Sequence, residues 1–224
     1  MINLSFMDLR LMFWSLRYQD SSAKPNNYWS HAPREQLNKL IDHLSNAESA
    51  ERVKLREILD RRKPGSILDV GCGPATELSG YEKHGLNINY TGLDGSEVML
   101  KVARKRHPTA RFVKGNAQNL EFPNSSFNAV LLKHILEHLP SYESAVSEAV
   151  RVASEMVLID FFQRPIPLSP WDMKIKNCKG YWENWYGERK FENFLSTCQV
   201  RGFRKHFVRR ERGQTDVIYE IDKK

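Results

Sequence analysis

The sequence predicts an α/β fold with a Rossmann-like, seven-stranded, mostly parallel sheet, helices on both faces and a C-terminal antiparallel hairpin. From residue 66 onward, short apolar segments alternate with helical ones, which is typical of right-handed βαβ crossovers. Near the C-terminus the order changes, because two strand-like segments are separated only by the turn Arg212-Gly213-Gln214. That pair predicts a hairpin, which adds an antiparallel edge to the parallel sheet.

Each expected element follows from a local pattern. A charged helical stretch runs from about Pro33 to Arg62, and Pro64-Gly65 ends it. Beyond it, glycines and polar residues bound each apolar run and separate strands from helices. We expect strands at 66–70, 89–93, 111–114, 127–132, 156–161, 203–210 and 216–221, and helices at 75–84, 96–106, 142–152 and 188–198.

The chain is long enough to bury one core, so we expect a single globular unit. Within it, residues 1–64 are predicted to form a helical lid or cap, and residues 65–224 the main domain, with an insertion at about 162–186. Apolar residues recur at helical spacing over residues 1–18 and predict an amphipathic helix. We expect that helix to pack on its own domain or on a second subunit, in a homodimer, rather than on a membrane surface.

Charge and composition limit the function classes. The chain has 34 Lys and Arg against 27 Asp and Glu, a net charge of +7. Basic clusters occur at 61–63, 101–114 and 201–212, but acids alternate with them, so a solvated face is favoured over nucleic-acid binding. No apolar run approaches the ~20 residues of a membrane span. Three cysteines without a CxxC pair indicate a reducing compartment, so we expect a cytoplasmic protein.

The most informative segment is a strand end that enters a glycine turn, Ile67-Leu68-Asp69-Val70-Gly71-Cys72-Gly73-Pro74-Ala75. The glycines let the backbone turn sharply and approach a ligand, and the following helix offers free N–H donors. A dinucleotide-binding turn would have a third glycine at position 76, where this chain has Thr76. The segment therefore indicates a nucleotide-like ligand other than NAD.

Asp94 stands at the end of the next expected strand. It follows Gly71 by about the 20 residues at which an acidic residue meets ribose hydroxyls in nucleotide-binding sheets. The alternative role is an N-cap for the helix beginning near Ser96, but Ser96 can cap that helix itself. We therefore favour ribose binding by Asp94.

A third segment, Gly115-Asn116-Ala117, follows the third expected strand. It belongs at the C-terminal edge of the sheet, where open α/β folds place their ligands. There, the Asn116 oxygen can accept a hydrogen bond from an adenine amino group, while the Ala117 N–H donates to a ring nitrogen.

In this order and spacing, the three segments resemble class I S-adenosylmethionine (SAM)-dependent methyltransferases, especially the small-molecule enzymes of the UbiE-like or methyltransferase 11 type. The resemblance covers about residues 66–160, including Phe122-Pro123-Asn124-Ser125-Ser126-Phe127-Asn128-Ala129-Val130 and His134-Ile135-Leu136-Glu137-His138-Leu139. It implies that SAM is the cofactor and S-adenosylhomocysteine the product.

The resemblance also assigns parts of the cofactor to residues. The glycine loop would hold the methionine part, Asp94 the ribose and Asn116-Ala117 the adenine, and the strand end near Lys133 would contact the amino-acid moiety through its backbone. Three positions depart from the family pattern, because Ala75 replaces a frequent third glycine, and Asn116 and Asn128 replace common aspartates. The expected cofactor residues are Asp69, Gly71, Cys72, Gly73, Asp94, Gly95, Met99, Asn116, Ala117 and Lys133.

Methyl transfer from a sulfonium needs alignment, exclusion of water and at most one base. The candidate base is His134, which follows the fourth strand at the rim where an acceptor would lie. The alternative is a partly exposed structural histidine. His138, one helical turn further, is expected to pack structurally. The two histidines lack a third converging ligand, so no metal is expected.

The acceptor is expected to meet the N-terminal segment and the stretch from Phe162 to Tyr186, which is rich in aromatic and cationic residues. Such a long connection is often a lid, and its side chains suit a sugar, a flat ring or an anionic group. A small hydrophobic subcore with snorkelling lysines is the open alternative. The candidate acceptor residues are Tyr28, Arg164, Lys176 and Trp182.

The sequence therefore predicts a SAM-dependent methyltransferase that acts on an O or N atom of a small, anionic or sugar-like acceptor. An RNA methyltransferase is the alternative that the positive charge favours, although the Asn/Asp-Pro-Pro-aromatic tetrad for base amines and an RNA-binding module are missing. A second alternative is a non-catalytic SAM-binding protein. The presence of Gly71, Gly73 and Asp94 argues against it, because such a protein would be expected to have a damaged cofactor site.

Overall fold

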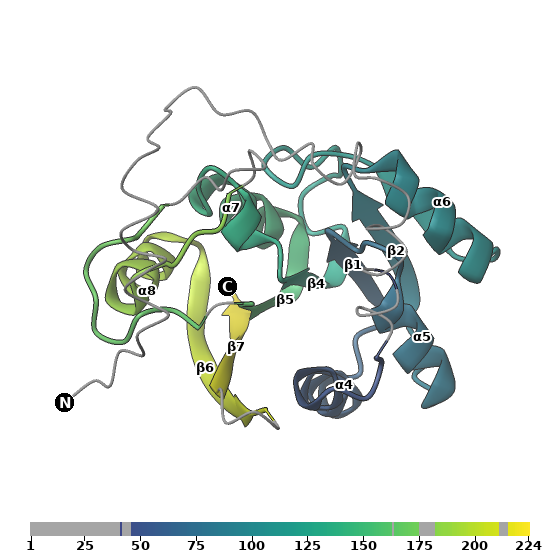
Figure 1. Cartoon of the computed structure of the whole chain (residues 1–224), viewed down its shortest axis with the longest axis horizontal. Helices are drawn as coiled ribbons and strands as arrows, with labels where there is room; N and C mark the ends of the chain where they lie inside the picture. The colour runs from purple at the N-terminus through teal and green to yellow at the C-terminus, as the bar shows by residue number, and fades with distance from the viewer. Residues whose placement is uncertain (1–40, 42–45, 163, 175–181, 211–214) are drawn as a thin grey trace.

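The computed structural model describes residues 41, 46–162, 164–174, 182–210 and 215–224. In this part of the chain, a seven-stranded sheet with the order β3-β2-β1-β4-β5-β7-β6 forms the centre of the molecule (Figure 1). Its first five strands pair in parallel, and β7 runs antiparallel to both β5 and β6. The strands are β1 Ser66–Val70, β2 Asn89–Asp94, β3 Arg111–Lys114, β4 Phe127–Lys133, β5 Ala153–Asp160, β6 Val200–Arg209 and β7 Thr215–Lys223.

The expected sheet and hairpin are thus confirmed. The strand order reverses between β1 and β4, which makes the C-terminal ends of these two strands the switch point where open α/β sheets bind ligands. The helices are α4 Ala50–Arg62, α5 Thr76–Lys83, α6 Glu97–Arg106, α7 Glu143–Val152 and α8 Glu188–Thr197, with the 3-10 helix η1 at Leu136–His138.

The sheet has a separate core on each face. Alternation along β1 sends Ile67 to one face and Leu68 and Val70 to the other. Ile67 packs with buried residues of α4, α5 and α6, whereas Leu68 and Val70 pack with those of α7 and α8. Strands covered on both faces read as continuous apolar runs, which explains the composition of β1 and β4.

The long helix expected from Pro33 to Arg62 is interrupted where the structure describes it, so that expectation was wrong in part. Residues 46–49 form a turn, and α4 begins at Ala50. The cause is local, because the Asn46 side chain accepts the Glu48 N–H at 3.0 Å and so competes with helical hydrogen bonding. The amphipathic helix expected over residues 1–18 lies outside the described residues.

Within the described residues, no helix has the length and apolar character required to cross a bilayer.

Candidate active site

The glycine turn after β1 folds tightly over the end of β2. Gly71 and Gly73 have φ values of 78° and 53°, in the left-handed region that glycine adopts without strain. The N–H groups of Gly71 and Cys72 both donate to the Leu93 carbonyl, at 2.7 and 3.0 Å. A side chain at Gly73 would meet no atom of the described residues within 4 Å, so none of these residues covers the outer surface of the turn.

Asp94 connects this turn to the start of α6. Its carboxylate accepts the Gly73 N–H at 2.9 Å and the Ser96 N–H at 2.7 Å. Ser96 is the N-cap of α6, and its hydroxyl accepts the Met99 N–H at 3.4 Å. Because Ser96 caps the helix, Asp94 is not needed as its N-cap, and its place at the end of β2, next to the switch point, suits the ligand-binding role that stays a prediction. Burial raises the pKa of this carboxyl.

Asp69 and Cys72 point into the protein core. Asp69 is 2% exposed, and the Tyr90 hydroxyl donates to it at 2.7 Å. Burial, and next Glu77, raises the pKa of Asp69 to about 7. A side chain added at Gly92 would lie 2.8 Å from Cys72 Sγ, so the thiol faces the sheet. Cofactor contacts of these two residues stay predictions.

The third predicted segment lies beside the second. The Gly115 N–H donates to the Asp94 carbonyl at 3.1 Å, which joins the ends of β3 and β2. Gly95 is next to this contact, because a side chain there would lie 3.6 Å from the Gly115 carbonyl. Asn116 is exposed, and its side-chain oxygen accepts the Gln118 N–H at 3.0 Å. A carbonyl oxygen has two lone pairs, so Asn116 keeps an acceptor for an adenine amino group.

Ala117 and Met99 are buried behind this edge. Ala117 belongs to the α7–α8 core, which leaves its backbone as the group available to a ligand. Met99 packs with Ile41 in a small separate cluster. The structure therefore brings the three predicted cofactor segments to one edge of the sheet, with a Gly73 backbone that no described residue covers and a carboxylate at Asp94, and these features fit an adenosyl group.

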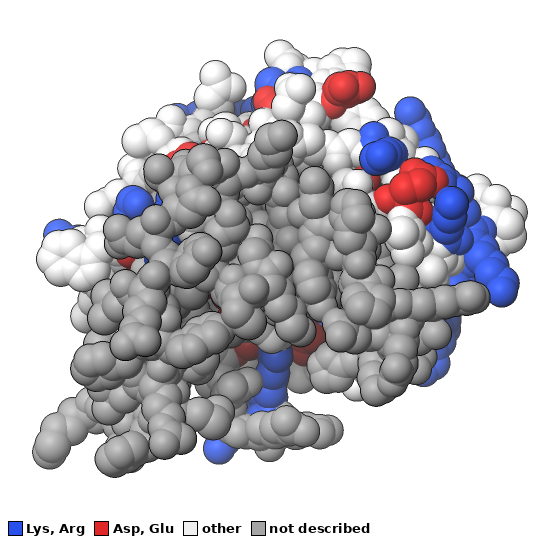
Figure 2. Space-filling model, turned by 45° about the horizontal axis from the view of Figure 1, so that its top comes forward, with Lys and Arg blue, Asp and Glu red and all other residues white. Residues whose placement is uncertain are grey.

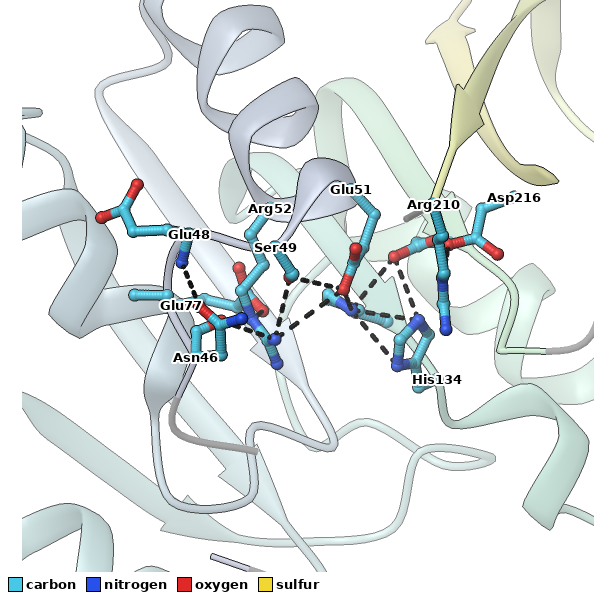
Figure 3. Close-up of polar contacts among 12 residues, drawn as sticks. Asn46, Glu48, Ser49, Glu51, Arg52, Glu77, His134, Arg210 and Asp216 are labelled. Atoms are coloured by element: carbon cyan, nitrogen blue, oxygen red, sulfur yellow. Dashed lines mark hydrogen bonds and ion pairs between the residues drawn. The ribbon is translucent and has the colours of Figure 1, made fainter. Parts of the chain in front are cut away.

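A group of buried charges lies at the ends of β4 and β5 (Figure 3). The Asp160 carboxylate has no exposed surface, and its Oδ2 atom is 3.1 Å from Lys133 Nζ and 3.2 Å from His134 Nε2. Glu51 of α4 adds a second carboxylate 3.7 Å from Lys133 Nζ. Lys133, assigned from its backbone alone, thus also places its side chain in this charged cluster.

His134 has an unusual backbone for a residue with a side chain. Its φ is 53°, and its N–H donates to the Asp160 carbonyl at 2.9 Å. The ring meets Phe162 edge-on, with 5.5 Å between centroids. Burial, and next the positive charge of Lys133, lowers the pKa of His134. A neutral imidazole near physiological pH is the form that can accept a proton.

At the N-terminal end of α4, charged side chains connect the cluster to α5, the helix that follows the glycine turn. Arg52 Nε lies 2.7 Å from Glu77 Oε1, and both side chains are nearly buried. Arg52 also donates to the Ser49 hydroxyl at 3.2 Å, and that hydroxyl donates to Glu51 at 2.6 Å. Figure 3 shows Glu51 on the side of His134, whereas Arg52 points toward Glu77.

Arg210 and Asp216 approach the cluster from the β6–β7 hairpin (Figure 3). The two residues form an ion pair, and burial raises the pKa of Asp216 to about 6. The Arg210 guanidinium carbon lies 6.0 Å from the centre of the Phe162 ring, so Phe162 contacts both Arg210 and His134. Arg210 Nη2 is buried without a hydrogen-bond partner in the described part of the chain.

The predicted acceptor residues are only partly described, since Tyr28 and Lys176 lie outside the described residues. The Arg164 guanidinium lies 5.3 Å above the exposed Phe207 ring of β6. The Trp182 carbonyl is 2.9 Å from His138 Nδ1, which supports the expected structural role of His138. Arg164 and Trp182 keep their acceptor roles as predictions.

Sequence reasoning missed Glu51, Arg52, Asp160 and Arg210. Asp160 had a usable signal, because it is an acid at the end of an apolar strand, as Asp94 is. The other three reach the site through tertiary packing of α4 and the hairpin. Asn128, one of the departures from the family pattern, has a structural role, because its side chain accepts the Ser66 N–H and bonds Glu155 at the opposite edge of the sheet.

Comparison with known proteins gives the class that this geometry indicates. Residues 68–156 match the family model described as "Methyltransferase domain". The matched segment contains the glycine turn, Asp94, Asn116-Ala117 and His134. Residues 68–156 are therefore similar to a methyltransferase domain, and the resemblance noted in the sequence is confirmed over this segment.

Two relatives share about a third of the aligned residues. The chain is 35% identical over 126 residues to a demethylmenaquinone methyltransferase of Listeria welshimeri, with 52% of each chain covered. It is 31% identical over 119 residues to a phthiotriol/phenolphthiotriol dimycocerosates methyltransferase of Mycobacterium leprae, which covers 50% of this chain and 43% of the relative. The chain thus spans about half the length of the curated relatives it matches.

Solved structures show the same fold at low identity. The 1,6-didemethyltoxoflavin-N1-methyltransferase of Burkholderia thailandensis, bound to 1,6-didemethyltoxoflavin and S-adenosylhomocysteine, is 16% identical with a TM-score of 0.62, and the match covers 92% of this chain and 97% of that one. DesVI of Streptomyces venezuelae is 16% identical with a TM-score of 0.57, covering 84% and 98%. Both confirm the fold.

Proposed function

We propose that this protein transfers the methyl group of SAM to a small acceptor and that His134 takes the proton that the acceptor loses. The observation that carries the proposal is the common edge of the sheet. The open glycine turn and Asp94 end β1 and β2, while Lys133 and His134 end β4 on the other side of the switch point. A cofactor bound at the ends of β1 and β2 would place its reactive end toward the end of β4.

The residues divide the work of the reaction. When bound, SAM supplies an electrophilic methyl group on a sulfonium. Asp94 would hold the ribose hydroxyls, and the Gly71–Gly73 backbone would hold the methionine part. His134 would accept the acceptor's proton on its imidazole, and Phe162 would exclude water from that ring.

The acceptor class follows from the charges near His134. Arg210 lies beside Phe162, and its buried Nη2 group has no hydrogen-bond partner among the described residues, so it suits an anionic or strongly polar acceptor oxygen. The names of the relatives, one of them the ubiquinone/menaquinone biosynthesis C-methyltransferase UbiE of Campylobacter jejuni, add a ring carbon to the O and N atoms expected from the sequence. For a hydroxylated ring, removal of the hydroxyl proton by His134 activates oxygen and ring carbon alike.

The basic clusters offer little support for an RNA acceptor. Arg61, Arg62 and Arg204 all contact the buried carboxylate of Glu220. Basic side chains also gather over α6, at the far end of the sheet (Figure 2). These helix residues are mostly exposed, as expected for a solvated face.

A thermal-shift measurement tests the cofactor assignment first. SAM or S-adenosylhomocysteine at about 100 times its dissociation constant should stabilise the wild type by about 2.7 kcal/mol, whereas NAD should not. Asp94→Ala should lose most of this shift, and Asp60→Ala, on the exposed surface of α4, should keep it. If neither SAM nor S-adenosylhomocysteine stabilises the wild type, the proposal is refuted.

Transfer itself is then measured with methyl-labelled SAM and a panel of hydroxylated, amino and carboxylated ring acceptors. Label should move to at least one acceptor with the wild type and much more slowly with His134→Asn. Binding of SAM without transfer to any acceptor would favour the non-catalytic alternative.

A further inference from the structure

The contacts of His134 converge on one residue of the neighbouring strand. Asp160 ends β5 and is directly paired with Lys133, which ends β4. Its carbonyl accepts the His134 N–H at 2.9 Å, and its Oδ2 atom lies 3.2 Å from His134 Nε2. A single residue therefore holds both the backbone and the ring of the candidate base.

His134 needs such support because its conformation is unfavourable on its own. A left-handed backbone is unfavourable for any residue that carries a side chain. His134 is not held inside a helix either, because η1 begins only at Leu136. Strain of this kind persists where the surroundings determine the conformation, and here Asp160 and Phe162 do so.

We propose that Asp160 is a positioning residue: it orients the His134 ring and stabilises the imidazolium that forms when the ring takes the acceptor's proton, while Lys133 opposes that charge. The inference rests on the proposed function, in which His134 is the base. The proton moves from the acceptor to the imidazole, and Asp160 stays a carboxylate throughout. The Asp160 contact is an ion-pair contact, 3.2 Å from Nε2, so it strengthens when the ring becomes an imidazolium.

The charges around His134 and Asp160 determine how readily the His134 ring is protonated. Lys133 Nζ lies 3.0 and 3.2 Å from the two ring nitrogens and 3.1 Å from Asp160 Oδ2. Burial and Lys133 hold the pKa of His134 down, and Asp160 raises it. Other charges face the cluster from the elements packed around it, namely Glu51 and Arg52 of α4 and Arg210 and Asp216 of the hairpin.

Two substitutions should change the pKa of His134 in opposite directions. Asp160→Asn is isosteric and removes the negative charge, so the pKa of His134 should fall. Lys133→Met removes the opposing positive charge, so that pKa should rise. Asp222→Asn changes a carboxylate at the other end of β7 and should leave His134 unchanged. NMR titration of the imidazole in the ligand-free proteins measures these pKa changes and needs no acceptor.

The same variants are then compared in the labelled transfer assay. Asp160→Asn should lower kcat by at least tenfold, with the acid limb of its pH profile displaced to lower pH, while the thermal shift by SAM stays at the wild-type value. Lys133→Met should displace that limb to higher pH. A general base contributes about 10²–10⁴-fold, so these losses are measurable.

Distinct outcomes separate the two proposals. The positioning role is overturned if Asp160→Asn leaves the His134 titration in place, or weakens SAM binding as much as it slows transfer. If His134→Asn transfers methyl groups as fast as the wild type, the base itself is refuted and the pair is structural only. Should Asp160→Asn fail to fold, Lys133→Met with its upward displacement remains the deciding variant.

Discussion

Ala75 has a φ of 58° at the N-cap of α5, at the position where the resemblance to the methyltransferase family implies a third glycine. The structure explains that preference, since glycine occupies the left-handed region without strain. The methyl group of Ala75 is nevertheless fully buried in the α4–α6 core. Backbone strain therefore favours glycine at position 75, whereas the buried methyl contacts favour alanine.

Ala75→Gly should therefore cost little stability. Relief of strain, roughly 1–2 kcal/mol, offsets the lost methyl contacts and the added chain entropy. Ala103→Gly, equally buried but inside α6, has no such relief and should cost about 1 kcal/mol in helix propensity plus its contacts. Urea denaturation compares the two, and equal losses would contradict the explanation.

Asp69 should make the stability of the protein depend on pH. Its pKa of about 7 in the folded state lies above the ordinary value of 3.8, so the folded protein binds a proton that the unfolded chain has released. Wild-type stability from this group is present below pH 3.8 and is lost as pH rises toward 7. Asp69→Asn lacks this loss, so its melting temperature relative to wild type should increase between pH 4 and pH 7.

An exposed carboxylate provides the comparison for Asp69. Asp60→Asn on α4 should differ from wild type by the same small amount at every pH. A difference between Asp69→Asn and wild type that does not change with pH would mean that Asp69 stays ionised in the folded protein.

At the level of elements, the alternating pattern and the glycine turn were enough to predict the sheet and the edge at which Asp94 and Asn116 meet. Those features depend on short-range chemistry, namely apolar runs, left-handed turns and strand ends. Glu51 and Arg210 could not be predicted, because they reach His134 only after α4 and the hairpin pack on the sheet. The turn at residues 46–49 was missed because one Asn side chain interrupts an otherwise helical composition.

The inner part of the 162–186 insertion is anchored on η1, directly after the candidate base. Asn184 has no exposed surface, and its amide donates to the Leu139 carbonyl at 2.7 Å. The Tyr186 hydroxyl donates to the Leu136 carbonyl at 2.7 Å. The outer part is attached in turn, because Met173 and Trp185 exchange backbone hydrogen bonds.

Asn184→Ala should loosen this layer without unfolding the sheet. It leaves the Leu139 carbonyl buried and unpaired, at a cost of about 1–3 kcal/mol. Hydrogen exchange should accelerate in residues 166–173 and 184–187, while the strands keep their protection. Asn193→Ala, on the exposed side of α8, is the control, and unchanged exchange in both variants would show that the anchor is unimportant.

Helix α4 is attached to the sheet at both of its ends. Its N-terminal Glu51 lies near Lys133 at the end of β4. Its C-terminal Arg61 and Arg62 contact Glu220 of β7, across almost the whole length of the domain sequence. The helix that precedes the sheet therefore connects the candidate active site with the last strand. Residues 1–40 lie outside the described range, so the cap and the homodimer stay predictions.

Glu220 is the centre of the second attachment. Its side chain has no exposed surface, and it contacts Arg61, Arg62, Arg204 and His206. The desolvation that burial imposes would raise its pKa, but the hydrogen bonds from Arg204, His206 and Arg61 outweigh it and hold the pKa at about 2. The folded pKa is below the ordinary value of 4.5, so this contribution to stability is present above pH 4.5 and is lost as pH falls toward 2.

Glu220→Gln should lower the free energy of unfolding at pH 7 by about 1.5–3 kcal/mol, the range for hydrogen bonds to charged groups, with a value near the lower end because the arginines are partly exposed. The deficit relative to wild type should shrink as pH falls below 4.5, because the unfolded wild type then binds a proton at Glu220 that the folded protein still excludes, which lowers wild-type stability. Urea denaturation at pH 7, 5 and 3.5 measures it. Asp222→Asn, which removes a more exposed carboxylate that contacts Arg62 and Arg204, should cost less. A deficit that is equal at all three pH values would show that packing, rather than the charge of Glu220, holds α4 to the last strand.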